Sequence, residues 1–265
     1  MTLTLGSGPF GERSHGRFNF SLEHAPDHVL YIEDFPRRVR AVLGGETVLD
    51  TTRGKLLHET AHLPVLYVPI DDLRGDLLEP TDHSTHCPFK GDASYLTIRT
   101  GDRVAENAAW YYPEPLDGAA PITGHAALYW DAMDCWYEED EPVFGHLRDP
   151  YHRVDVRAGS THVRVSVDGE VVAETRQPKL LYETGLPVRY YIPPADVRTD
   201  VLSPTDTHTV CPYKGTASYW TLSAGDRTLT DVAFGYPDPL PEAMPAKDHL
   251  CFMGDGVDVE VSAAA

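Results

Sequence analysis

The chain contains one sequence module twice. The motif Cys87-Pro88-Phe89-Lys90-Gly91 returns 124 residues later, from Cys87 to Cys211, as Cys211-Pro212-Tyr213-Lys214-Gly215, and further identities recur at this offset on both sides of it. Solenoid and propeller repeats have periods of roughly 20 to 50 residues, so each copy here is expected to be a whole domain with its own core. We expect an N-terminal arm over residues 1–19, a first domain over residues 20–143 and a second over residues 144–265.

Short strands dominate the predicted secondary structure. Gly44-Gly45 and Asp168-Gly169 are typical of hairpin turns between them. Helical periodicity is thin, because 22 prolines and 21 glycines interrupt the chain at short intervals. The pattern predicts two all-β domains, with short helical turns beginning near Asp72 and Asp196. The predicted strands, which are runs of alternating or β-branched residues, lie at 28–32, 39–43, 95–99, 163–167, 169–173 and 257–261.

Charge and cysteine content exclude several classes of protein. With 41 acidic and 22 basic residues the formal net charge is −19, which disfavours nucleic acid and anionic membranes as partners. Residues 1–20 lack an apolar core of signal-peptide length and no run of about 18 apolar residues occurs, so a cytoplasmic protein is expected. Four cysteines without a Cys-x-x-Cys pair predict neither a disulfide framework nor a redox dithiol.

The repeated Cys-Pro-aromatic-Lys-Gly motif is expected to form a tight turn. Proline fixes φ at the second position and glycine tolerates a positive φ after the fourth, which brings the Cα atoms of Cys87 and Lys90 within about 7 Å. A lysine close to a cysteine favours the thiolate, a nucleophile. Cys87, Lys90, Cys211 and Lys214 are therefore the candidate catalytic residues. The alternative is that the cysteine packs as a small apolar residue while the lysine keeps its head group in water.

Lysine usage supports a specific role for this turn. The chain has only five lysines, and four of them form the repeat-matched pairs Lys55/Lys179 and Lys90/Lys214. Arginine is far more frequent, so a cation needed only for solvation would more often have been arginine. A point charge on a flexible stem explains the retained lysines better.

Other repeated residues around the turn are candidates for ligand binding. Glu59 and Glu183 are either acid–base groups or counter-ions of the lysines, and the aromatic residues are typical of ligand pockets and of cores alike. The first copy contributes Glu59, Tyr95, Trp110 and Tyr112, and the second contributes Glu183, Tyr219 and Tyr236.

A metal site is not expected. His83, His86 and Cys87, with His125, have suitable side chains for zinc, but the second copy has Thr207 and Val210 in the equivalent positions of the two histidines. The chain also lacks a phosphate-binding glycine loop, a dinucleotide fingerprint and a nucleophile elbow, so no cofactor is expected.

Longer motifs carry a resemblance to a known family. Leu-x-Pro-Thr-Asp, Cys-Pro-Tyr-Lys-Gly-x-Ala-x-Tyr-Trp, Glu-Asn-Ala-Ala-Trp-x-Tyr-Pro-Glu-Pro and the connector at residues 144–156 resemble domain-of-unknown-function family 427, in a tandem bacterial form, over nearly the whole chain. The resemblance implies mainly β domains of the tent-like type, each of two antiparallel sheets meeting at an angle. Related zinc-bearing modules have cysteines that are absent here. A nucleotidyltransferase label used for the family finds no phosphate-binding loop or carboxylate pair in this chain.

The sequence thus leaves three hypotheses about function. The leading one is a pocket at the turn of each domain, where Lys90 and Lys214 bind or polarise an anionic or carbonyl-containing small molecule. The second is a noncatalytic protein-interaction or structural module, in which the turn is structural and the aromatic segments contact a partner. The third is thiol redox chemistry, which is weakened by the lack of a nearby second cysteine. Independently of these hypotheses, the repeat allows the two homologous domains to pack on each other with a pseudo-two-fold relation.

Overall fold

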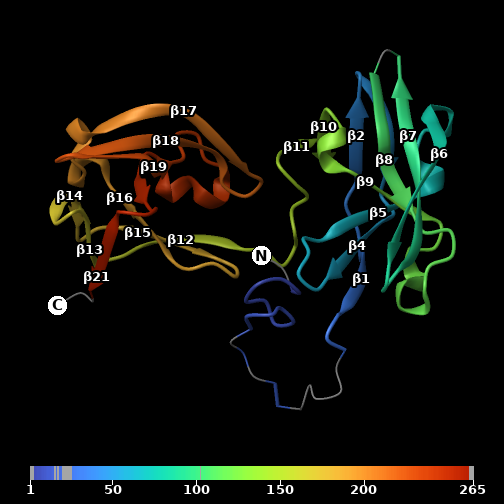
Figure 1. Ribbon diagram of the computed structural model, residues 1–265, viewed down its shortest axis with the longest axis horizontal. Helices are drawn as coiled ribbons and strands as arrows, with labels where there is room; N and C mark the ends of the chain where they lie inside the picture. The colour runs from blue at the N-terminus through green and yellow to red at the C-terminus, as the bar shows by residue number, and fades with distance from the viewer. Residues whose placement is uncertain (1–2, 15, 17, 20–25, 102, 263–265) are drawn as a thin grey trace. The chain divides into compact units, whose positions relative to one another are not determined.

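The structure is a computed structural model that describes residues 3–14, 16, 18, 19, 26–101 and 103–262. The chain divides into two compact units between Tyr151 and His152, beyond the boundary near residue 143 that the repeat predicts. We call these units the first and the second domain. Figure 1 shows the course of the chain through each of them.

The first domain consists of two antiparallel sheets. Seven strands pair in the order β1-β4-β5-β9-β8-β7-β6, and four pair in the order β11-β10-β2-β3. The strands are β1 (Leu30–Phe35), β2 (Val39–Leu43), β3 (Glu46–Thr51), β4 (Gly54–Glu59), β5 (Val65–Pro69), β6 (Leu78–Cys87), β7 (Gly91–Thr100), β8 (Arg103–Tyr111), β9 (His125–Leu128), β10 (Cys135–Glu138) and β11 (Glu141–Val143). The short 3-10 helices are η1 (Ile70–Asp72), η2 (Gly75–Leu77), η3 (Asp117–Ile122) and η4 (Trp130–Ala132).

The second domain repeats this arrangement. Its large sheet has the order β12-β15-β16-β20-β19-β18-β17 and its small sheet has the order β14-β13-β21. The strands are β12 (Val154–Ala158), β13 (His162–Val167), β14 (Glu170–Thr175), β15 (Lys179–Glu183), β16 (Arg189–Ile192), β17 (Leu202–Cys211), β18 (Gly215–Ala224), β19 (Arg227–Gly235), β20 (Leu250–Phe252) and β21 (Asp258–Ser262). The 3-10 helices are η5 (Pro194–Asp196), η6 (Thr199–Val201) and η7 (Pro241–Ala246).

The two strand orders correspond one for one, with β1 equivalent to β12 and β10 equivalent to β21. Only β11 has no counterpart among the described strands. This confirms the predicted fold class of two tandem, homologous, mainly β domains with few short helices. Within the described ranges, no helix combines the length and apolar character that a membrane crossing requires.

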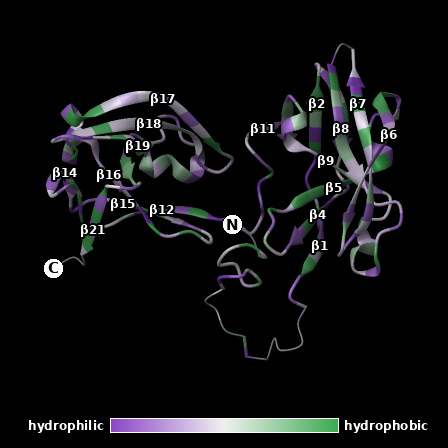
Figure 2. Cartoon of the chain, viewed as in Figure 1, coloured by the Kyte–Doolittle hydropathy of each residue, from purple (hydrophilic) through white to green (hydrophobic). Residues whose placement is uncertain are grey.

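The large sheet of each domain buries both of its faces. One face packs against the small sheet around aliphatic residues such as Ile98 in the first domain and Leu222 in the second, both fully buried. The alternation of buried and partly exposed residues along β2 reflects this one-sided packing, and Figure 2 shows apolar stretches along the strands of both domains. The other face carries an aromatic cluster covered in the first domain by η3, with Ala119 and Ile122 buried against it.

Local sequence signals explain the turns better than the helices. Gly44-Gly45 and Asp168-Gly169 have two successive positive φ angles, as a type I′ hairpin turn requires. The predicted helical turns at Asp72 and Asp196 are present, but they end at these residues rather than begin there. At the ends of η1 and η5 the two carboxylates accept hydrogen bonds from Thr51 and Thr175, both at 2.5 Å.

Because each domain has its own aliphatic core, we predict that Ile98→Ala and Leu222→Ala act locally. Each substitution leaves a cavity and is expected to cost about 2–5 kcal/mol of the free energy of unfolding of its own domain. The two positions are repeat-equivalent and fully buried, so each variant is the matched control of the other. Hydrogen exchange of backbone amides should accelerate in the altered domain alone; equal acceleration in both domains would contradict this prediction.

Candidate functional site

In each large sheet, the repeated turn connects the edge strand, β6 or β17, to the next strand, β7 or β18. The backbone N–H of Lys90 donates to the carbonyl of Cys87 at 3.3 Å, and Lys214 donates to Cys211 at the same distance. Gly91 follows with a φ of 101°, which is readily available only to glycine. The predicted β-turn is therefore formed in both domains, and it places Lys90 and Lys214 immediately before β7 and β18.

Each turn lysine is held by a buried carboxylate from a more distant strand of the same large sheet. The ammonium of Lys90 donates to Oε2 of Glu59 at the end of β4, and the ammonium of Lys214 donates to Oε2 of Glu183 at the end of β15. These four side chains are between 8% and 12% exposed, so the pairs are shielded from solvent. The counter-ion role of the two glutamates is thus the one the geometry provides.

A histidine completes each group. Nε2 of His28 lies 2.9 Å from Oε1 of Glu59, and Nε2 of His152 lies 3.1 Å from Oε1 of Glu183. In each domain the glutamate therefore bridges an imidazole and an ammonium. We call His28, Glu59 and Lys90 the first His-Glu-Lys site, and His152, Glu183 and Lys214 the second.

The aromatic residue of the turn orients the histidine. The rings of His28 and Phe89 are stacked, with centroids 3.6 Å apart and an interplanar angle of 6°. The rings of His152 and Tyr213 are 4.2 Å apart at 37°. One turn thus supplies both the cation of the site and the surface against which its imidazole rests.

The charges of the site stabilise the ionised glutamates. Burial by itself would raise the pKa of Glu183, but the hydrogen bond from His152 and the ammonium of Lys214 lower this pKa to about 2. Burial likewise opposes ionisation of Glu59, and hydrogen bonds from Lys90 and His28 lower its pKa. Both carboxylates are therefore anionic at neutral pH, and each neutralises the lysine beside it.

The N-terminal arm takes part in the first site. The fully buried Thr4 donates its hydroxyl to the backbone carbonyl of Glu59 at 2.9 Å. The backbone N–H of Ala61 in turn donates to the carbonyl of Thr4 at 3.1 Å. The arm thereby fixes the end of β4 that carries the carboxylate.

The aromatic residues of the first domain that the sequence predicts to bind a ligand belong to the aromatic cluster on the face of the large sheet that is covered by η3. Tyr95 and Tyr112 are buried there, and the indole N–H of Trp110 donates to the hydroxyl of Tyr67 at 3.3 Å. Burial raises the pKa of Tyr112 far above its ordinary value. These residues are packed together in one cluster that also includes Cys87 of the turn.

The same holds in the second domain, where Tyr219 and Tyr236 pack around Phe234. The hydroxyl of Tyr219 lies 2.9 Å from that of Thr209, and the equivalent Tyr95–Thr85 distance is also 2.9 Å. These pairs tie the outermost strand of each sheet to its neighbour.

The candidate nucleophiles lie beside the site and not in its ion pair. Cys87 and Cys211 are partly buried and pack against the aromatic residues, and all four cysteines of the chain are free thiols. The ammonium that was expected to stabilise a thiolate is bound by a glutamate instead. A nucleophilic role of the two cysteines stays a prediction.

His28 and His152 are not among the residues that the sequence predicts for the site, although Pro26-Asp27-His28 and Pro150-Tyr151-His152 lie at the same offset as the rest of the repeat. Their equal spacing was the signal that could have found them. The metal candidates do not converge: His83 packs on Tyr95, and His86 pairs with exposed Asp92. No group of three potential metal ligands occurs within the described part of the chain.

Fold and site together define a class of protein, with two copies of one all-β domain that each carry a buried His-Glu-Lys site. A family model described as a domain of unknown function (DUF427) matches residues 31–139 and 155–263, one match in each domain. The chain belongs to this family. Both matches include the glutamate and the lysine of the site and begin just after its histidine. A search among curated proteins found no match.

We predict that the His-Glu-Lys site makes stability depend on pH in the acid range. The pKa of Glu183 is about 2 in the folded protein, below its ordinary value of 4.5, so the unfolded chain takes up a proton first. The stabilisation is complete above about pH 4.5 and is lost as the pH falls through about 2. Urea unfolding at a series of pH values measures this effect.

The variant Glu183→Gln should lose that acid-dependent part. At neutral pH it should also cost about 3–5 kcal/mol, because the buried ammonium of Lys214 loses its counter-ion. The control Glu174→Gln removes a half-exposed carboxylate paired with His162 and should cost at most about 1 kcal/mol. Identical acid profiles for Glu183→Gln and the unaltered protein would refute the assignment.

Proposed function

We propose that each domain binds a small molecule through an anionic or carbonyl oxygen at the lysine of its His-Glu-Lys site. The observation that supports this is the unfilled hydrogen-bonding capacity of the ammonium. A lysine ammonium has three N–H donors, and among the described residues Lys90 and Lys214 each have one acceptor, a glutamate. Buried donors are normally satisfied by protein, water or ligand, so the remaining N–H groups of each lysine can donate to an oxygen atom of a bound molecule.

The chemistry of the site indicates the kind of acceptor. The glutamate cancels the charge of the lysine, yet it leaves the ammonium polarised and fixed in position, which lowers the cost of ordering a long flexible side chain on binding. A carboxylate, a phosphate or a carbonyl oxygen is a suitable partner for the remaining N–H groups. In the first site, Nδ1 of His28 has no partner among the described residues, and this side chain is 19% exposed. The imidazole can therefore contribute a second polar contact.

The competing hypothesis is that the site is only a structural clamp. A buried ion pair that joins the turn to β4 or β15 could fix the hairpin without binding anything. The clamp predicts that the ammonium groups do not respond to small oxygen-containing molecules. Binding and clamping can therefore be separated by observing the lysines themselves.

The experiment uses protein labelled with ¹⁵N at lysine, in which the five lysines give few signals. Acetate, pyruvate and inorganic phosphate are added in turn, and the Nζ–H resonances are recorded. At least one probe is expected to shift the Lys90 and Lys214 signals in a saturable manner, while Lys55 and Lys179 stay unchanged. The last two are the other repeat-matched lysines and serve as internal controls.

Variants decide whether the lysine itself binds. Lys214→Met should abolish the response of the second domain and leave that of Lys90 intact, whereas Lys179→Met should change neither. The double variant Glu183→Leu with Lys214→Met removes both charges at once. Proteins often tolerate the replacement of a buried ion pair by apolar residues, so this variant covers the case in which Lys214→Met alone does not fold. The proposal is wrong if none of the three probes shifts either buried ammonium signal.

A further inference from the structure

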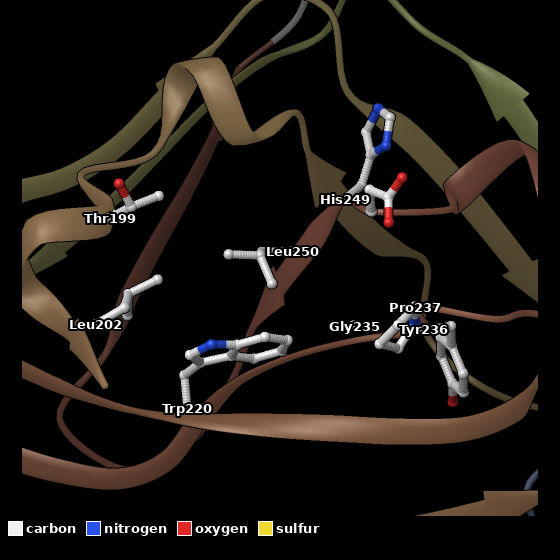
Figure 3. Close-up of a pocket in the computed structure, with 9 residues that line it drawn as sticks. Thr199, Leu202, Trp220, Gly235, Tyr236, Pro237, His249 and Leu250 are labelled. Atoms are coloured by element: carbon white, nitrogen blue, oxygen red, sulfur yellow. The ribbon is translucent and has the colours of Figure 1, made fainter. Parts of the chain in front are cut away.

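The second domain contains a cavity of about 310 Å³ that is distinct from the His-Glu-Lys site. It lies between β18, β19, β20 and η6, and its walls are mainly apolar. Figure 3 shows the indole of Trp220 below Leu250, with Leu202 at one end and His249 above. A cavity of about 150 Å³ suffices to hold benzene in a protein core, so this one can take an aromatic ring with a short side chain.

Trp220 is the residue that gives this cavity its character. The other three tryptophans each pack on another aromatic ring: Trp110 on Tyr129, and Trp130 on Trp136. Trp220 has no aromatic partner among the described residues, and its indole N–H has no acceptor there. An aromatic surface that borders a cavity without a ring partner is suited to stack on the ring of a ligand.

Comparison of the two copies shows how the cavity arises. At the offset of the repeat, Trp220 replaces Leu96 and Gly235 replaces Tyr111, a residue that packs against the core of the first domain. The equivalent strand pairings, Ser218 with Gly235 and Ser94 with Tyr111, confirm this correspondence. The loss of a tyrosine side chain at Gly235 leaves space beside Trp220.

Part of that space is taken up again. Leu250 replaces Ala126, and one of its methyl groups would lie 3.3 Å from a Cβ atom at position 235. A Cβ atom there would also lie only 2.6 Å from the carbonyl oxygen of His249. The glycine is therefore required by the approach of β20, and the cavity remains in spite of the larger leucine.

The charge at the cavity selects among aromatic ligands. Exposed Asp248 is the only carboxylate among the nine described residues that line it, and the first domain has Gly124 in this position. Asp248 has a φ of 61° and Gly124 has a φ of 71°, so the aspartate occupies a conformation that suits glycine better. We infer that this cavity is a binding site for a small aromatic molecule with a cationic amino group, the ring on Trp220 and the ammonium toward Asp248.

The inference does not rest on the proposed function of the His-Glu-Lys sites. His152, Glu183 and Lys214 are not among the residues that line the cavity. Binding at the cavity should be unaffected by Lys214→Met, so failure of one proposal does not entail failure of the other.

The test uses phenethylamine as the probe. Of its two analogues, 2-phenylethanol lacks the charge and 2-cyclohexylethylamine lacks the aromatic ring. The indole N–H resonances of the four tryptophans are followed by NMR, with the Trp220 signal assigned by its loss in Trp220→Leu. Phenethylamine should shift this signal with a dissociation constant on the order of 1 mM. The alcohol should bind about two- to fivefold more weakly, and the cyclohexyl analogue about three- to tenfold more weakly.

Variants that restore first-domain residues provide matched controls. Asp248→Gly should still bind the aromatic ring, but phenethylamine and 2-phenylethanol should then bind with equal affinity. The backbone tolerates this substitution because glycine readily adopts the positive φ of residue 248. Gly235→Tyr with Leu250→Ala should fill the cavity and abolish binding; Leu250→Ala removes the side-chain contact at position 235, and the carbonyl of His249 must also shift to admit the new Cβ atom. Trp220→Leu, read from backbone amide shifts at Leu250, covers the case in which the double variant does not fold and should weaken binding about three- to tenfold.

Three outcomes would overturn the inference. The first is the absence of any Trp220 shift at about twenty times the expected dissociation constant. The second is equal binding of phenethylamine and its cyclohexyl analogue, which would show that stacking has no part. The third is unchanged binding in Trp220→Leu or in a folded cavity-filled variant, which would place the probe elsewhere.

Discussion

The buried contact between a turn lysine and a strand glutamate is the interaction on which the His-Glu-Lys site of each domain depends. It joins the hairpin at Lys90 to the end of β4 in the first domain, and the hairpin at Lys214 to the end of β15 in the second. In neither domain does that strand pair with a strand of the hairpin. A buried ion pair has a high desolvation cost, which only good geometry and additional hydrogen bonds offset. The histidine on the second carboxylate oxygen provides one such bond, and the aromatic residue of the turn holds that histidine in place.

Duplication has kept this interaction and changed others. Both sites use the same atoms at nearly the same distances, although the ring of the turn is Phe89 in one and Tyr213 in the other. The outer end of the large sheet has diverged, since Leu96 and Tyr111 correspond to Trp220 and Gly235. A two-domain chain can retain one set of contacts in both copies while another region changes in one copy, because each copy has its own core to support the change.

The aromatic clusters have a supporting part in this arrangement. Tyr67, Tyr95 and Tyr112 fill the face beneath the first turn, and burial raises the pKa of Tyr67 and Tyr112 well above the physiological range. They remain neutral and apolar in effect, which keeps the surroundings of the ion pair poor in water and strengthens its electrostatic interactions. The cysteines at the turn belong to this packing.

The sequence by itself determined the two-domain organisation, the mainly β class, the hairpin turns at Gly44-Gly45 and Asp168-Gly169, and the choice of Lys90 and Glu59 as candidate site residues. Repeats and turn chemistry are local or periodic signals that a single chain displays directly. Only the tertiary structure decided that the lysine binds glutamate rather than cysteine, that His28 joins them, and that Gly235 opens a cavity beside Trp220. These outcomes depend on which strands become neighbours and how closely they approach, and no local pattern encodes that proximity.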